Sequence, residues 1–281
     1  MNNPRFKRSG KKGGKRGKRN SGSNSATEVL YGRQPVRELL LAGRRRVEAF
    51  YTAPQVRQRA DQEDILALAS GKGIAVQQTD AVTLDTMADG GNHQGVVAVV
   101  SPFRYVSYKK MLSDAEQVQD PLFLFLDHLE DPQNVGSLLR TAEAAGVCGV
   151  VIPEHRAAGI TAAVVRASAG ASEHLVIAQV PNLVRCMRLL KERGVWFAGL
   201  EAGEGSQDLT SVDMRGAMGI VVGSEGKGMR RLTRENCDYL VRLPMLGKVS
   251  SLNAGVAGAI ALYEVIRQRR EKENANTCVS G

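Results

Sequence analysis

Short apolar runs alternate with longer segments of helical periodicity from residue 121 onward, and this alternation restricts the fold more than any other feature of the chain. The runs are apolar at nearly every position, which predicts strands that are buried on both faces. Such strands, when helices separate them, are typical of an α/β fold with a parallel sheet covered on both sides. We predict strands at 122–126, 149–152, 175–179, 195–199, 219–222 and 239–242. We predict helices at 135–145, 161–169, 182–193, 228–235 and 252–270.

A smaller α/β unit is predicted over residues 28–100, which is within the usual size range of a domain. Residues 101–119 lose the apolar rhythm and predict a linker to the second unit, 120–272, which a polar tail, 273–281, follows. In the small unit we predict helices at 29–42, 56–70 and 83–87, and strands at 47–51, 74–77 and 95–100.

The positive charge of the chain is concentrated at its amino terminus. The chain has 38 Lys and Arg against 29 Asp and Glu, and nine of the 38 lie in residues 1–27, which contain no acid. The remainder therefore carries no net formal charge. The segment 1–27 has too few apolar residues to fold alone. It is either a solubilising extension or an arm that binds phosphates without sequence preference, and its many glycines argue against an amphipathic targeting helix.

Composition also argues against several classes of protein. No apolar run reaches the ~20 residues of a membrane-spanning helix, and no secretory signal is apparent. The cysteines and histidines lack the spacing of metal ligands, so we predict a reduced, cytoplasmic protein without a metal site. These residues are Cys148, Cys186, Cys237, Cys278, His93, His128, His155 and His174.

Three short blocks rich in glycine, proline and polar residues lie where predicted strands lead toward helices. The first is Asp-Pro-Gln-Asn-Val-Gly-Ser-Leu-Leu-Arg at 131–140, and the second is Gly-Ser-Glu-Gly-Lys-Gly-Met at 223–229. The third comprises Leu-Pro-Met at 243–245 and Ser-Ser-Leu-Asn at 250–253. In open α/β sheets this junction is where ligands bind. We therefore expect a functional site formed by the three blocks.

Each block also has a purely structural interpretation. The second block is a glycine-rich turn, and it is neither a P-loop nor a dinucleotide fingerprint, because Gly228 follows Lys227 and no G-x-G-x-x-G is present. Glu225 favours function, since an acid in such a turn is a poor choice for packing. Ser251 and Asn253 are suited to cap the last helix.

The first block has the same two interpretations. Asn134 is a good N-cap, and Gly136 stands in the first helical turn, where Ala would be more stable by ~1 kcal/mol. That cost indicates a close approach at Gly136. Arg140 is either part of a solvated helix face or, six residues beyond Asn134, part of the same site.

Taken together, the three blocks resemble the motifs of the SpoU class of the SPOUT superfamily of RNA methyltransferases. The resemblance covers residues 122–269 and includes the order, spacing and context of all three motifs. Tyr-Gly-Arg-Gln-Pro-Val-Arg-Glu-Leu-Leu at 31–40 and His-Gln-Gly-Val-Val-Ala at 93–98 resemble the substrate-binding domain of RlmB-like members, which modify guanosine in 23S ribosomal RNA. The chain departs from the family at 254–255, where Ala-Gly replaces the frequent Val-Ser.

This resemblance implies methylation of a ribose 2′-hydroxyl in RNA by a homodimer. It further implies a trefoil knot formed by 219–229 and 240–255. S-adenosylmethionine would lie in the knot, held by the backbone of Gly223, Leu243 and Leu252, with Met245 nearby.

The resemblance also implies roles for five site residues. Arg140 is often proposed as the base in this family, but an arginine side chain keeps its proton at any useful pH. We therefore expect it to act as an electrostatic clamp on a phosphate and on the developing alkoxide. The residues expected to position the ribose and hold the arginine are Asn134, Glu225, Ser251 and Asn253.

Three alternatives remain at this stage. A transfer-RNA ribose methyltransferase would use the same chemistry, and a non-catalytic RNA-binding protein would keep only the fold. An oxidoreductase is disfavoured because the dinucleotide fingerprint is missing.

Overall fold

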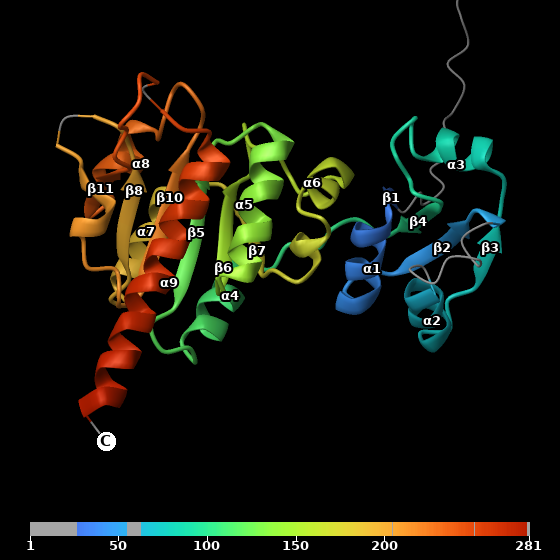
Figure 1. Ribbon diagram of the computed structural model, residues 1–281, viewed down its shortest axis with the longest axis horizontal. Coiled ribbons are helices and arrows are strands. Elements are labelled where there is room, and N and C mark those ends of the chain that lie inside the picture. Colours follow the sequence, from blue (N-terminus) through green and yellow to red (C-terminus); the bar gives the residue numbers. More distant parts are fainter. Residues whose placement is uncertain (1–26, 55–62, 204, 250, 280–281) are drawn as a thin grey trace, which may run out of the picture.

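Two α/β units make up the computed structural model, which describes residues 27–54, 63–203, 205–249 and 251–279 (Figure 1). The basic segment 1–26 lies outside the described residues. The small unit contains a four-stranded sheet in the order β1-β4-β2-β3, in which β1 and β2 both pair antiparallel with β4. Its elements are β1 (Glu28–Tyr31), α1 (Arg33–Ala42), β2 (Val47–Thr52), α2 (Glu63–Gly71), β3 (Val76–Gln78), α3 (Ala81–Met87) and β4 (Val96–Val100).

The first predicted helix, 29–42, is wrong at its start, because residues 28–31 form the strand β1. Their backbone pairs with Val97–Val100, a contact that no local pattern contains. Helix α1 begins only at Arg33, after Gly32, whose φ of 94° interrupts any helix at that point. Part of the predicted helix 56–70 lies outside the described residues, and α2 forms its described part.

The predicted parallel sheet of the second unit is confirmed. Seven strands lie in the order β7-β6-β5-β10-β8-β11-β9, and each pairing between them is parallel. The six predicted strands are all present, and β9 was not predicted because it has only two residues. The strands are β5 (Leu122–Asp127), β6 (Gly149–Pro153), β7 (Ile177–Val180), β8 (Trp196–Leu200), β9 (Gln207–Asp208), β10 (Met218–Gly223) and β11 (Tyr239–Arg242).

Helices cover both faces of this sheet, as the apolar strands require. Leu138 of α5 and Leu262 of α9 pack on one face, whereas Met111 of α4 and Met187 of α7 pack on the other. Alternate residues of β5 supply the two cores, with Leu124 on the first side and Phe125 on the second. The helices are α4 (Tyr108–Ala115), α5 (Pro132–Ala144), α6 (Ala162–Ala167), α7 (Leu183–Lys191), α8 (Arg231–Glu235) and α9 (Ala254–Val279).

The expected linker, 101–119, contains the helix α4. Ser107 caps this helix by accepting a hydrogen bond from the backbone N–H of Lys110 at 3.3 Å, and Met111 and Leu112 are buried against the sheet. The segment thus contributes to the core of the second unit, but its apolar positions are too few to show a helical rhythm. Helix α9 likewise continues past residue 270 to Val279, into the residues predicted as a polar tail.

A buried arginine joins the two units. The Arg45 side chain donates to Glu28 at 2.6 Å, to the Ser101 carbonyl at 2.7 Å and to Glu173 of the second unit at 3.2 Å. Burial raises the pKa of the Glu173 carboxyl, and the nearby Arg45 opposes that rise. The Arg166 guanidinium on α6 also lies over the Tyr31 ring, 5.0 Å from its centroid. The small unit is therefore held against α6 and the segment that follows it.

Within the described residues, none of the helices is both long enough and apolar enough to cross a membrane.

Candidate functional site

The first two blocks meet because the strands before them are neighbours in the sheet. Strands β5 and β10 pair in parallel, and their last residues, Asp127 and Gly223, stand opposite one another. The loops that follow both strands therefore leave the sheet at the same carboxyl edge. This is the junction at which the sequence predicted a site.

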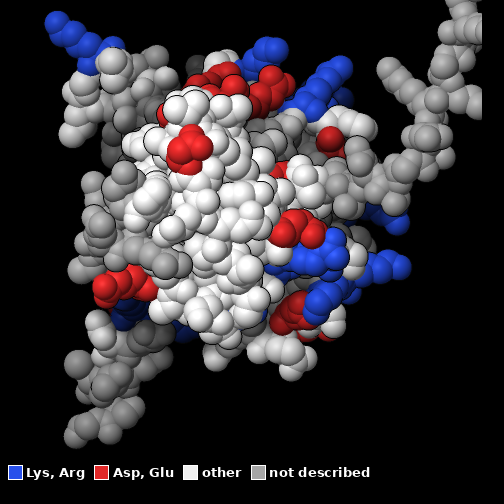
Figure 2. Space-filling view, turned by 90° about the vertical axis from the view of Figure 1, so that its right-hand side faces the viewer, with Lys and Arg blue, Asp and Glu red and all other residues white. Residues whose placement is uncertain are grey.

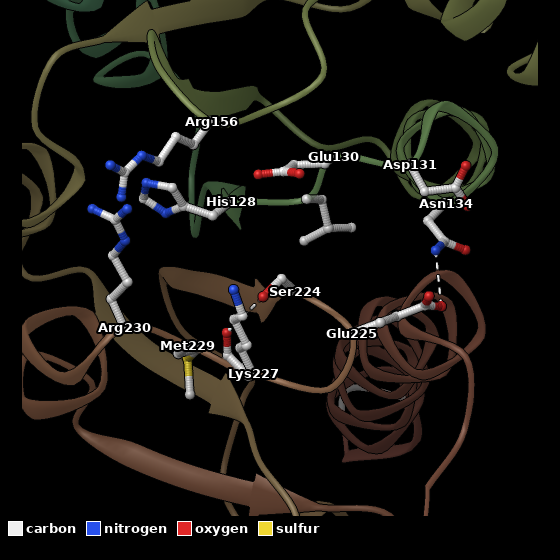
Figure 3. Close-up of a pocket in the computed structure, with 12 residues that line it drawn as sticks. His128, Glu130, Asp131, Asn134, Arg156, Ser224, Glu225, Lys227, Met229 and Arg230 are labelled. Atoms are coloured by element: carbon white, nitrogen blue, oxygen red, sulfur yellow. Dashed lines mark hydrogen bonds between the residues drawn. The ribbon is translucent and has the colours of Figure 1, made fainter.

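One side chain from each block joins a three-membered hydrogen-bond cluster at this edge. Asn134 Nδ2 donates to Glu225 Oε1 at 2.9 Å (Figure 3). Asn253 Nδ2 donates to the same oxygen at 2.9 Å and to Asn134 Oδ1 at 2.7 Å. The cluster joins residues that are 91 and 119 positions apart, so only the tertiary fold can assemble it.

Two helix starts supply the amide groups of this cluster. The N-cap of α5 is Asp131, whose carboxylate accepts from the Gln133 backbone N–H at 3.1 Å, so the predicted capping role of Asn134 is wrong. Asn134 lies inside the first turn with its amide free to reach Glu225. Asn253 has the expected capping role, because its Oδ1 accepts from the Val256 N–H at 3.2 Å, and its Nδ2 joins the cluster.

Arg140 stands apart from the cluster. It is exposed on α5, and within the described part of the chain no hydrogen bond or ion pair engages its side chain. Six residues along a helix correspond to a rotation of about 240° from Asn134, so the two side chains leave α5 in different directions. Ser251 is also exposed and takes no part in the cluster's hydrogen bonds.

Both glycines singled out in the blocks face the protein's own chain. A Cβ on Gly136 would clash with Ala167 of α6, so helix packing explains the close approach that the sequence indicated there. A Cβ on Gly223 would clash with the backbone of Gly228 and Met229. The second block folds back over its own first residue, and this tight turn carries Glu225 toward Asn134.

The other residues expected at the cofactor lie on the segment between β11 and α9. Leu243 is half-buried against the core, Met245 is half-exposed, and the Leu252 residue is 40% exposed. Residues 244–249 make no backbone hydrogen bond in the described structure, so their main-chain polar groups are available to a ligand.

A cleft of about 410 Å³ opens between the first two blocks and the loop after β6. It lies next to the hydrogen-bond cluster, because Asn134 and Glu225 are part of its wall (Figure 3). None of the four residues expected at the cofactor lines it. The wall consists of His128, Leu129, Glu130, Asp131, Asn134, Arg156, Ser224, Glu225, Lys227, Gly228, Met229 and Arg230.

Sequence reasoning missed the residues at the far end of this cleft. Asp127 is fully buried, contacts the His128 ring, and accepts the Arg230 backbone N–H at 2.7 Å. Arg156 lies on the loop after β6. Their only signal in the sequence is position, since each follows shortly after a strand or a block. Among the described residues, no group of three or more His, Cys, Asp or Glu side chains is placed to hold a metal.

Comparison with known proteins agrees with this geometry. The profile of the SpoU rRNA Methylase family matches residues 121–263, which contain all three blocks. The chain belongs to this family. A second profile, described as RNA 2′-O ribose methyltransferase substrate binding, matches residues 29–106 of this SpoU methylase.

Relatives and solved structures extend along most of the SpoU methylase chain. It is 41% identical over 246 residues to the 23S rRNA (guanosine-2′-O-)-methyltransferase RlmB of Vibrio cholerae, a match that covers 87% of this chain and 98% of that protein. It is 43% identical to the TrmH family protein YacO of Bacillus subtilis, covering 86% and 96% of the two chains. The AdoMet-bound rRNA methyltransferase of Sinorhizobium meliloti superposes with a TM-score of 0.70 at 25% identity, covering 86% and 87%.

We predict that Gly223→Ala destabilises the protein. The new Cβ has to displace backbone atoms of Gly228 and Met229, which overpacks the turn and lowers the free energy of unfolding by about 1–3 kcal/mol. Urea unfolding measures this effect. Gly247→Ala is the matched control, because a Cβ there meets open space. Equal stability of the two variants would contradict the packing explanation.

Proposed function

We propose that this chain transfers a methyl group from S-adenosylmethionine to the ribose 2′-hydroxyl of a guanosine in 23S ribosomal RNA. The observation that carries the proposal is the cluster of Asn134, Glu225 and Asn253, which joins one polar side chain from each family motif beside an open cleft. The chain is 41% identical to the RlmB of Vibrio cholerae over 98% of that protein, and this similarity supports the choice of substrate.

The segment after β11 fits a cofactor held through the main chain. We propose that the backbone at Gly223, Leu243 and Leu252 holds S-adenosylmethionine, with Met245 beside it. The main chain of 244–249, which lies between Leu243 and Leu252, makes no backbone hydrogen bond with another described residue. This supports the placement, because an adenosyl group can use the donors and acceptors of that segment. The cofactor supplies the reactive methyl group, and the protein supplies the positions of the reactants.

The hydrogen-bond cluster is suited to orient the ribose. Both amide donors use Oε1 of Glu225, which leaves Oε2 of this exposed side chain without a partner among the described residues. That oxygen is free to accept a hydrogen bond from the 2′-hydroxyl. The two asparagines hold the carboxylate in place, so the hydroxyl meets an oriented acceptor. Ser251, two residues before Asn253 of the cluster, is proposed to contact the substrate as well.

We further propose that the protein is a homodimer in which Arg140 acts at a site that both copies form. Helix α9 packs on α5 and carries an exposed apolar stripe at helical spacing, consisting of Val256, Ile260 and Tyr263, which are 47%, 42% and 53% exposed. A second copy placed on this stripe would lie beside the helix that bears Arg140. The Arg140 guanidinium, which has no partner among the described residues, would then be available to clamp a phosphate and the developing alkoxide.

Two finer features belong to the same proposal. We propose that residues 219–229 and 240–255 form a trefoil knot, which is supported by the return of Asn253 to the loop after β10. We also propose that the protein acts in the cytoplasm, since Cys148, Cys186 and Cys237 are all free thiols.

Methylation assays with defined RNA test the substrate. The purified protein, incubated with S-adenosylmethionine, is expected to introduce a 2′-O-methyl group at one guanosine of unmodified 23S rRNA. Unmodified transfer RNA serves as the second substrate, because the Bacillus subtilis relative is named as a tRNA/rRNA methyltransferase. Methylation of transfer RNA alone would replace the proposed substrate, and methylation of neither RNA would refute the function.

We predict that Ile260→Glu disrupts the homodimer. A carboxylate in the middle of the apolar stripe loses its hydration when two copies associate, so sedimentation equilibrium should show a monomer. Val82→Glu is the control, because Val82 is a 74% exposed apolar residue of the small unit. A wild-type protein that is itself monomeric would contradict the proposal.

Arg140→Ala is predicted to slow single-turnover methylation by ~10²-fold or more while leaving the affinity for S-adenosylmethionine unchanged, as expected when one preorganised charge is lost. Arg140→Lys separates the clamp from a base. A lysine keeps the charge but loses the planar two-point grip, so a clamp predicts an impaired variant whose rate does not climb as the lysine deprotonates. A log-linear rise with pH in the Lys variant alone would identify a base.

A further inference from the structure

The cleft beside the hydrogen-bond cluster has two chemically different ends. Asp131, Asn134 and Glu225 lie at one end, near the starts of α5 and α9 (Figure 3). At the other end, the side chains of Arg156 and Arg230 point toward the His128 ring from two sides (Figure 3). The function proposed above uses only the first end.

A buried carboxylate holds the cationic end together. One oxygen of Asp127, which has no exposed surface, contacts His128 Nδ1, and the other accepts the Arg230 backbone N–H at 2.7 Å. His128 and Arg156 have φ values of 61° and 56°, which are unusual for residues with a side chain. Such strain persists where the surrounding structure enforces it, and it is concentrated at functional sites.

The lysine and arginine side chains of the cleft have no acidic partner. Within the described residues, the side chains of Arg156, Lys227 and Arg230 make no ion pair or hydrogen bond. The neighbouring arginines of α8 are paired, Arg231 with Glu235 at 2.8 Å and Arg234 with Glu201 at 2.7 Å.

Glu130 is the remaining acid of the cleft, and it stands between the two ends (Figure 3). It is exposed and makes no ion pair with a described residue. The cationic end therefore carries the charges of two arginines against the single buried carboxylate of Asp127.

The face of the small unit seen in Figure 2 offers RNA a less concentrated positive site. On the face of the small unit that Figure 2 shows, the centre is largely uncharged, and Lys and Arg lie toward the margin next to Asp and Glu. Two guanidinium groups that converge in a cleft are suited to grip one phosphate, because each presents a planar fork of donors.

We propose that Arg156 and Arg230, with His128 beside them, bind the RNA phosphate next to the ribose that lies at Glu225. This inference rests on the proposed function, because it takes the occupant of the cleft to be the substrate RNA. One cleft then holds the sugar at its amide and carboxylate end and the adjoining phosphate at its cationic end. The two contacts fix the direction of the RNA strand across the site.

The test uses Arg156→Gln, Arg230→Gln and the double variant in the full chain, with a 23S rRNA fragment that wild type methylates. Each single variant should weaken RNA binding about 5- to 30-fold. The double variant should fall short of the product of the single effects, because both side chains act on one phosphate. The slope of log K against log salt should decrease by about 0.7, the value for one phosphate contact with single-stranded RNA.

Arg231→Gln is the control, since Arg231 lies beside Arg230 but outside the cleft and pairs with Glu235. Affinity for S-adenosylmethionine, measured on every variant, reports whether the fold and the cofactor site are intact. Arg156→Lys keeps the positive charge that Arg156→Gln removes, so it should recover part of the RNA affinity that the Gln variant loses.

The outcomes separate this inference from the function on which it rests. If wild type methylates the fragment but the Arg156 and Arg230 variants bind it as Arg231→Gln does, the phosphate site is refuted and the function stands. A parallel loss of cofactor affinity would assign the cleft to the cofactor and also refute the site. If wild type methylates no RNA, the proposed function itself fails.

Discussion

The parallel pairing of β5 with β10 is the constraint on which the rest of the site depends. It places Asp127 opposite Gly223, so that the loops of the first two motifs leave the sheet side by side. From that edge, α5 presents Asn134 and the turn after β10 presents Glu225. The sheet thus supplies a rigid base, and the loops supply the chemistry, as is usual for parallel α/β folds.

The same edge of the sheet gives the cleft an end lined by amide and carboxylate groups and an end lined by cationic groups. Beside one end, Asn253 caps α9 and bonds to both Asn134 and Glu225, so the start of a helix and the site share one amide. Asp127 organises the other end from a buried position at the end of β5. Because hydrogen bonds in a partly buried site are costly to leave unmade, each cluster maintains its own geometry.

The small unit is attached to the large one by contacts that are separate from the site. Arg45 is buried between the units and bonds to Glu28, Ser101 and Glu173. Removing one member of such a network leaves a buried charge unpaired, which is strongly destabilising. The arrangement therefore holds the expected substrate-binding unit in one orientation beside α6, on the same molecule as the cleft.

The sequence by itself determined the parallel α/β class, the six longer strands of the large sheet and the three motif blocks, because buried strands and glycine-rich junctions are local patterns. It could not show that residues 28–31 form a strand or that 101–119 contains a packed helix, since both depend on partners far along the chain. Only the tertiary structure decided that Gly223 and Gly136 pack closely against other atoms of the same chain, where a Cβ would clash. It also decided that Arg140 stands apart from the cluster of Asn134, and that Arg156 and Arg230 lie near His128 in one cleft. Each of these outcomes depends on the distance between segments, which periodicity and composition do not encode.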